Sequence, residues 1–187
     1  MVAFLKKHWS NILFFIFIGL LILPQTRMPI QVFVQQIISF SPSEIEEDRR
    51  KSLTDYQWIL RDLDSTEINF SRSTGKVAIV NFWATWCPPC VAEMPSFQKL
   101  FDMYDEEVDF YFVTSEMPVK VKAFMEKEGY SMPVYFPSSE TPQQLQYTVL
   151  PTTFVISKSG EIVIEEEGAA HWNSDKMQVL LRQLVNN

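Results

Sequence analysis

The stretch Val77-Ala78-Ile79-Val80-Asn81-Phe82-Trp83-Ala84-Thr85-Trp86-Cys87-Pro88-Pro89-Cys90 decides the fold. Its first seven residues are almost all apolar, which predicts a buried strand. Cys87 and Cys90 are the only cysteines in the chain. A strand that ends in a Cys-x-x-Cys pair and turns into a helix builds a reactive dithiol, because the unpaired N–H groups and the dipole of a helix start stabilise a thiolate. We therefore predict that Cys87 opens a helix and that Cys90 can close a disulfide with it.

Charge is unevenly distributed along the 187 residues, whose formal net charge is −7. Residues 1–40 contain Lys6, Lys7 and Arg27 but no acid, so residues 41–187 carry 13 basic and 23 acidic side chains, a net charge of −10. This balance disfavours nucleic acid and anionic lipid as partners of the soluble part. Its length suits one domain with a single core. Because both cysteines lie in one motif, that core must supply the stability.

An uncharged run, Ile12–Leu23, follows the two lysines and allows two interpretations: a cleaved secretory signal or an uncleaved anchor. Counted from Trp9, the run spans roughly 22 Å as a helix, less than the roughly 30 Å hydrocarbon core. Pro24-Gln25-Thr26-Arg27 offers no small-x-small cleavage site, however, and snorkelling side chains lengthen the effective span. We therefore predict a signal anchor over residues 1–28 of a single-pass bacterial membrane protein. The positive-inside rule places its domain on the extracytoplasmic, periplasmic side.

A second apolar pattern follows the anchor. Five apolar residues recur at helical spacing, namely Ile30, Phe33, Val34, Ile37 and Ile38. This spacing predicts an amphipathic helix over residues 29–39, with Pro29 in its first turn. Such a helix could lie in the membrane interface, pack on a partner helix, or pack on its own domain. The charged stretch 44–51 indicates a solvated spacer, so we assign residues 29–54 to a linker and residues 55–187 to the domain.

Within the domain, hydrophobic periodicity and turn residues predict the order of elements. We expect strands at 56–60, 67–70, 77–83, 108–114, 134–136, 150–156 and 161–165. Helices are expected from Cys87, over 119–128 with Gly129 as the stop, and over 174–185 with Asn173 or Ser174 as the cap, with a helical turn at 141–147. This order predicts an α/β domain whose mixed sheet carries helices on both faces.

At this point the chain resembles the thioredoxin superfamily, and within it the membrane-anchored TlpA/ResA-like thiol-disulfide oxidoreductases of bacterial envelopes. The resemblance covers roughly residues 55–187. It is carried by residues that fall in the right order on the right elements, namely Val80 to Cys90, Glu93, Pro95, Pro151-Thr152-Thr153-Phe154 and Gly160.

The resemblance implies a role for each matching residue. Cys87 corresponds to the nucleophile and Cys90 to the resolving thiol, which releases the substrate from a mixed disulfide. Pro151 corresponds to a cis proline that faces the dithiol. Glu93 corresponds to an acid beneath the active site, whose raised pKa would let it carry the proton of Cys90. The residues expected to contact the substrate are Trp86, Pro88 and Leu150.

Three departures from the pattern bear on the chemistry. Asn81 stands where thioredoxin itself has a buried aspartate, so the proton route depends more on Glu93. A glycine that often precedes the cis proline is missing, which affects the shape of the substrate groove. Pro88 contributes neither charge nor an N–H group to stabilise the Cys87 thiolate, and we therefore predict a reducing dithiol.

The resemblance implies an extracytoplasmic reductase of protein disulfides, including apocytochrome c before haem attachment, that is recharged by a membrane electron-donor thiol protein. No cofactor, metal or nucleic acid is expected. Two alternatives stay open: an oxidase or isomerase on the same fold, and a copper chaperone that uses the cysteine pair with His171. Zinc would need four ligands, and only His8 and His171 accompany the cysteines.

Overall fold

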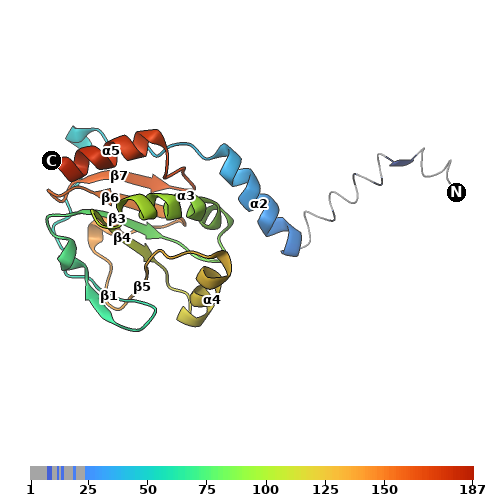
Figure 1. Cartoon of the computed structure of the whole chain (residues 1–187), viewed down its shortest axis with the longest axis horizontal. Helices are drawn as coiled ribbons and strands as arrows, with labels where there is room; N and C mark the ends of the chain where they lie inside the picture. The colour runs from blue at the N-terminus through green and yellow to red at the C-terminus, as the bar shows by residue number, and fades with distance from the viewer. Residues whose placement is uncertain (1–7, 10–11, 13, 15–18, 20–23) are drawn as a thin grey trace.

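The computed structural model describes residues 8–9, 12, 14, 19 and 24–187 (Figure 1). The predicted anchor over residues 1–28 lies mostly outside this set. Within the set, no helix is both long and apolar enough to cross a bilayer. The anchor therefore stays a prediction.

A seven-stranded sheet forms the centre of the domain, in the order β2-β1-β5-β4-β3-β6-β7. The strands are β1 (Ile59–Arg61), β2 (Glu67–Asn69), β3 (Val77–Phe82), β4 (Val108–Val113), β5 (Val134–Pro137), β6 (Thr152–Ile156) and β7 (Ile162–Glu167). The β3–β4 and β4–β5 pairs are parallel and the other pairs antiparallel, which confirms the mixed sheet. β1 begins later than predicted, because Asp55 and Tyr56 accept local hydrogen bonds from Gln57 and Trp58.

From residue 24 on, where the description is continuous, four α-helices accompany the sheet: α2 (Pro24–Ile38), α3 (Pro88–Tyr104), α4 (Pro118–Glu128) and α5 (Asp175–Asn186). Single 3-10 turns lie at Glu47–Arg49, Phe70–Ser73 and Gln143–Leu145. α4 stops at Gly129, whose φ of 73° is the left-handed conformation that glycine adopts without strain. Ser174 caps α5 by accepting a hydrogen bond from the Met177 N–H.

The α-helices cover one face of the sheet, which corrects the prediction of helices on both faces. Residues of α3, α4 and α5 share a hydrophobic cluster with Val77 and Ile79 of β3. The opposite cluster is closed by Trp58, Phe70 and Leu145, from an extended segment and two 3-10 turns. The chain steps from β3 to β4 to β5 in one direction across the sheet, and two right-handed crossovers in the same direction place α3 and α4 on the same face.

The segment between α2 and the domain is docked rather than solvated along its backbone. The Ile45 N–H donates to the Val163 carbonyl at 2.8 Å, and the Leu53 N–H donates to the Gly160 carbonyl at 2.8 Å. The Leu53 side chain is buried in the second cluster. The charged side chains mark a surface segment in the sequence, but its backbone covers the exposed edge of β7.

The description of α2 already includes the five residues before Pro29, the predicted start of the helix. Pro29 therefore lies inside the helix and not in its first turn. α2 packs against α3 (Figure 1).

Candidate active site

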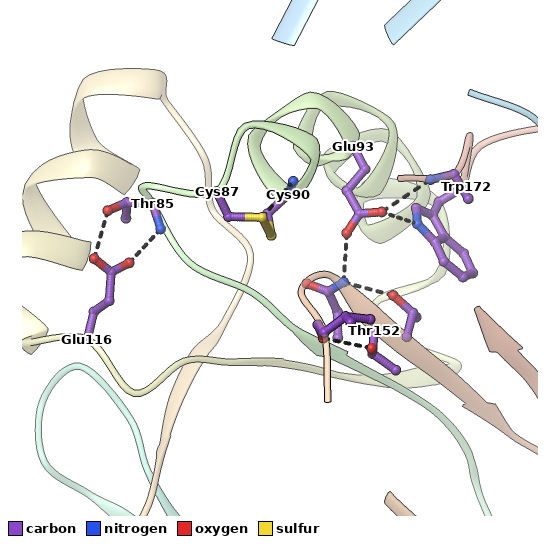
Figure 2. Close-up of a disulfide and its surroundings, with 11 residues drawn as sticks. Thr85, Cys87, Cys90, Glu93, Glu116, Thr152 and Trp172 are labelled. Carbon is purple, nitrogen blue, oxygen red and sulfur yellow. Dashed lines mark hydrogen bonds between the residues drawn. A yellow bond between two sulfur atoms is a disulfide. The ribbon is translucent and has the colours of Figure 1, made fainter. Parts of the chain in front are cut away.

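Cys87 and Cys90 form a disulfide at the start of α3, with their Cα atoms 5.3 Å apart (Figure 2). Cys87 is the N-cap residue of α3, and its Sγ accepts a hydrogen bond from the Cys90 N–H at 3.3 Å. Both cysteines are buried, Cys90 completely. The pair therefore sits at a helix N-terminus, where the backbone favours a negative sulfur on Cys87 once the disulfide is reduced.

Two tryptophans flank the dithiol in different ways. Trp83 is buried, and its backbone N–H donates to the Val113 carbonyl at 3.0 Å, so it anchors the end of β3. The Trp86 side chain is 61% exposed, next to the buried Cys87, and Pro88 is half-buried. The structure thus leaves Trp86 as the large apolar surface beside the cysteine, and Trp83 as part of the core.

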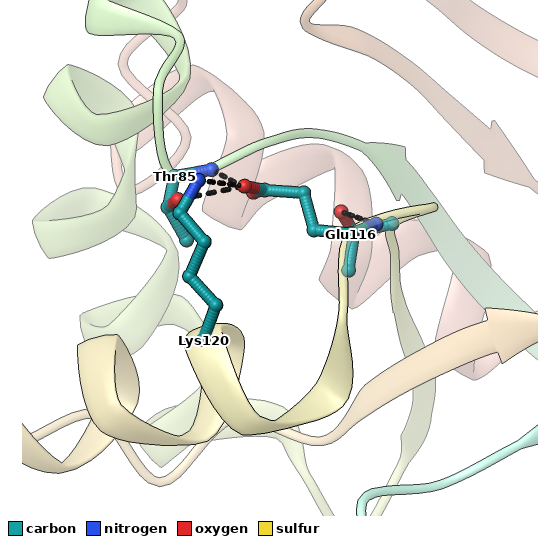
Figure 3. A network of polar contacts seen from close by, with 4 residues as sticks. Thr85, Glu116 and Lys120 are labelled. Carbon is teal, nitrogen blue, oxygen red and sulfur yellow. Dashed lines mark hydrogen bonds and ion pairs between the residues drawn. The ribbon is translucent and has the colours of Figure 1, made fainter.

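Glu116, in the loop between β4 and α4, holds the segment that leads into Cys87 (Figure 3). Its carboxylate accepts hydrogen bonds from the Thr85 N–H and from Thr85 Oγ1, and it pairs with Lys120. Burial raises the pKa of Glu116, but the hydrogen bonds from Lys120 and Thr85 outweigh burial and hold that pKa below its usual value. The sequence analysis missed this contact, whose sole local signal is the four-residue spacing of Glu116 and Lys120.

Glu116→Gln is expected to lower the free energy of unfolding at pH 7 by about 1 to 2 kcal/mol, because charge-assisted hydrogen bonds to Thr85 are lost. Urea denaturation of the oxidised protein measures this. Since the folded-state pKa of Glu116 is lowered, its stabilisation is present at neutral pH and disappears in acid as the carboxylate takes up a proton. Glu128→Gln is the control, because Glu128 pairs only with Lys127 at the surface. An equal loss in both variants contradicts the assignment.

Glu93 lies one turn after Cys90 on α3, is 1% exposed, and accepts three hydrogen bonds. The donors are Asn81 Nδ2 at 2.8 Å, Trp172 Nε1 at 2.9 Å and the Ala170 N–H at 3.4 Å. Burial raises the pKa of Glu93 to about 8; the three hydrogen bonds oppose this effect, and the charge of Glu166 adds to it. Glu93 therefore holds its proton at neutral pH but can release it slightly above.

Trp172 was not among the predicted site residues, yet it contacts Glu93 directly. Its ring stacks on Phe97 with centroids 4.8 Å apart, and its indole N–H points to Glu93 (Figure 2). Asn81 also holds the Glu93 carboxyl group in place, and its side-chain amide is itself fixed by a second hydrogen bond, which it donates to Thr153 Oγ1 at 2.8 Å. These contacts fix the Glu93 carboxyl group inside the domain.

Trp172→Phe is expected to raise the pKa of Glu93 above about 8, because the phenyl ring keeps the stacking but loses the donor that stabilises the carboxylate. Carboxyl NMR titration of the oxidised protein measures this pKa without interference from thiols. Trp83→Phe is the matched control, since the buried Trp83 Nε1 has no hydrogen-bond partner among the residues described. An unchanged Glu93 titration in Trp172→Phe would show that the indole does not act on the carboxyl group.

The Leu150–Pro151 peptide bond is cis, as the resemblance implied. The Pro151 carbonyl accepts a hydrogen bond from the Gly168 N–H at 2.9 Å. Thr152, the next residue, pairs with Phe82 at the end of β3 from which the chain leads into the dithiol. Pro151 and Cys87 therefore lie at the same end of the sheet. Leu150, which precedes Pro151 in the sequence, is half-buried.

His171 is exposed, and its backbone N–H donates to the Phe40 carbonyl at 2.8 Å. In the part of the chain that the structure describes, no three His, Cys, Asp or Glu residues are grouped so that they could hold a metal ion. The copper-chaperone alternative therefore gains no support from the geometry.

The comparisons with known proteins agree with this geometry. The family model described as Redoxin matches residues 43–181. The "Thiol-disulfide oxidoreductase ResA" of Halalkalibacterium halodurans is 35% identical over 109 residues, which cover 57% of this chain and 62% of that relative. The crystal structure of StoA from Bacillus subtilis matches with a TM-score of 0.51 and 26% identity over 59% of this chain and 87% of that one. A DsbF homologue from Corynebacterium diphtheriae, at 19% identity, shares the fold with a TM-score of 0.59 over 77% of this chain and 99% of that one. Because the family model matches most of the chain, including the Cys-x-x-Cys motif, the chain belongs to the Redoxin family.

Proposed function

We propose that this chain is an extracytoplasmic thiol-disulfide oxidoreductase that reduces protein disulfides through Cys87 and Cys90. The observation that carries the proposal is a Cys-x-x-Cys pair at a helix N-terminus with a buried, protonatable Glu93 one turn away. The name of the ResA relative supports the activity. The chain's match covers 62% of that relative, so its substrates and partners also belong to the proposal.

The reaction follows from the positions of the two sulfurs. In the reduced protein, the Cys87 thiolate attacks one sulfur of a substrate disulfide, forms a mixed disulfide, and expels the other substrate sulfur as a thiolate. Cys90 is completely buried, so its thiol reacts within the protein. It passes its proton to the Glu93 carboxylate and attacks the Cys87 sulfur. This step closes the Cys87–Cys90 disulfide and releases the second substrate thiolate, so two electrons pass to the substrate.

The groups around the dithiol favour the reducing direction. Pro88 lacks both a charge and an N–H group, so it gives the Cys87 thiolate no help. The helix N-terminus stabilises the Cys87 thiolate, but Pro88 adds nothing to this effect. A thiolate without a neighbouring cationic partner gives up its electrons more readily than one that has such a partner. We therefore favour a reductase over an oxidase.

The proposed substrate site uses the exposed and half-buried groups around Cys87. Trp86 would supply an apolar face, while Pro88 and Leu150 border the approach and Pro151 leaves the neighbouring backbone free for an extended substrate. Oxidised Cys-x-x-Cys proteins fit such a site, apocytochrome c among them. A membrane thiol protein would restore the reduced state, and the uncharged N-terminal run would place the domain outside the cytoplasm.

Trapping tests this function. Cys90→Ser should accumulate mixed disulfides with its partner proteins, because Cys87 still attacks but the resolving thiol is missing. The products are measured on nonreducing gels and should disappear on addition of dithiothreitol. A variant that combines Cys87→Ser with Cys90→Ser is the control and should trap nothing. Equal capture by both variants, or by neither, contradicts the proposal.

A further inference from the structure

α2 lies directly over the helix that carries the dithiol. Among the α2 side chains that the structure describes, four are partly buried: Met28, Gln31, Val32 and Gln35. A cavity of about 380 Å³ between the two helices is lined by Ile30, Gln31, Val34 and Gln35 from α2 and by Pro88 and Pro89 from α3. The first turn of α3, which begins at Cys87, is therefore next to α2, at the edge of the domain (Figure 1).

The chain after α2 fixes the orientation of this helix. The Phe40 carbonyl accepts from the His171 N–H at 2.8 Å, and the Ser43 N–H donates to Glu166 Oε2 at 3.1 Å. Two residues later, the Ile45 N–H donates to the carbonyl of Val163 on β7. With its inner face packed on α3 and its C-terminal end tied to the domain, α2 presents one defined face outward.

That outward face is apolar, in addition to the apolar Met28 and Val32 that line a second cavity against the domain. Phe33 is 63% exposed, Val34 47%, Ile38 51% and Ile30 37%. These residues are spaced so that they form one stripe along α2, which we call the outer stripe. A surface helix normally buries its apolar stripe against its own core, whereas here Gln31 and Gln35 are partly buried and the four residues of the outer stripe are exposed. Ile30 and Val34 also line the cavity on α3. The outer stripe is therefore available to something outside the domain.

The sequence on either side indicates what covers the outer stripe. Pro24, the first described residue of α2, follows the uncharged run Ile12–Leu23 in the sequence, so a bilayer that takes up this run lies next to α2. The first acid of the chain is Glu44, and the segment before it carries Lys6, Lys7 and Arg27. A segment with so few charges does not complement the charged surface of another protein. Its apolar residues and its few bases suit the apolar and interfacial layers of a lipid bilayer.

We propose that α2 is an interfacial helix, whose outer stripe lies in the surface layer of a lipid bilayer and whose inner face supports α3. Since an α-helix is about 10 Å wide, the first turn of α3 would then lie roughly one helix diameter from the lipid. The dithiol is thereby presented to partners at the membrane surface. Binding depends on burial of apolar side chains, and anionic lipid adds little because the domain is acidic. The inference does not rest on what the dithiol reacts with.

Spin labels on the full-length chain test this placement, even if residues 12–23 already anchor the protein. Val34→Cys is labelled with a nitroxide while Cys87 and Cys90 stay oxidised, and the protein is reconstituted into phosphatidylcholine vesicles. Val179→Cys on α5 is the matched control, because the two valines are 47% and 46% exposed. Collisions of each label with oxygen, which concentrates in lipid, and with a water-soluble nickel complex are then measured by electron paramagnetic resonance.

The proposal predicts a several-fold higher oxygen-to-nickel accessibility ratio at position 34 than at position 179, and the same result for Phe33→Cys. Addition of phosphatidylglycerol should leave the ratio unchanged. Equal nickel accessibility at 34 and 179 would overturn the proposal, because the stripe would face water. Protection from both reagents would also overturn it. Spin–spin broadening that disappears on dilution with unlabelled protein would then identify a second copy as the occupant, and its absence would identify the protein's own domain.

Discussion

Replacing Cys87 with serine is expected to reduce catalysed disulfide reduction by roughly 10³-fold or more, down to the uncatalysed background. Cys87 is one of only two cysteines, and it is the one at the cap position of α3, where a thiolate is stabilised. A serine hydroxyl at the same position is not ionised near neutral pH and cannot form a disulfide. The precipitation of insulin chains in the presence of dithiothreitol measures this rate.

Cys90→Ser separates the roles of the two sulfurs. It should lose turnover as well, but it should still complete one attack and remain bound to its substrate. Cys87→Ser should show neither turnover nor a mixed disulfide. If Cys87→Ser still reduced insulin, or if Cys90 trapped substrate in that variant, the assignment of Cys87 as the attacking sulfur would be wrong.

Glu93→Gln is expected to slow turnover by about 10²-fold, a typical contribution of a positioned acid or base. The rate of the wild-type protein should rise as the pH increases through about 8, because ionised Glu93 accepts the Cys90 proton. The variant should lack this rise. Stopped-flow measurement of the second step, closure of the Cys87–Cys90 disulfide, is the direct observation. A pH dependence that persists in Glu93→Gln would place the proton acceptor elsewhere.

The same substitution has a consequence for stability. Because burial raises the pKa of folded Glu93 to about 8, the unfolded chain releases the Glu93 proton between about pH 4.5 and pH 8 while the folded chain keeps it. Stability from this group is thus fully present below about pH 4.5 and declines up to about pH 8, by an amount on the order of a few kcal/mol. Glu93→Gln should not show that decline. Urea denaturation of the oxidised protein at pH 5 and pH 8.5 measures it, with the exposed Glu126→Gln as the control.

Local signals predicted those parts of the fold that depend on neighbours in sequence. The apolar run that became β3, the glycine that ends α4 and the serine that caps α5 each act within a few residues. The placement of the α-helices on one face could not be obtained in this way, because it depends on the strand order. The docking of Ile45 on β7 was also hidden, since it uses backbone groups of a segment whose side chains are charged.

The residues of the candidate site also divide into those that sequence patterns or a family resemblance predicted and those that only the fold brings together. Cys87 and Cys90 were found from their motif after an apolar run, and the resemblance to a known family implied Glu93 and the cis bond at Pro151. By contrast, Trp172 reaches Glu93 from 79 residues away, and Glu116 reaches Thr85 from 31 residues away. No periodicity or motif connects such pairs. They became visible only when the sheet brought the ends of β3, β4 and β7 together.

The reduction potential of the Cys87–Cys90 pair tests the central claim most directly. The oxidised and reduced forms of the full chain can be equilibrated with defined ratios of reduced to oxidised dithiothreitol and quantified after thiol alkylation. We expect a potential close to the value of about −270 mV found for thioredoxin. A potential near −120 mV, the value of the strongest dithiol oxidants, would contradict it, because the pair would then take electrons from its partners rather than supply them.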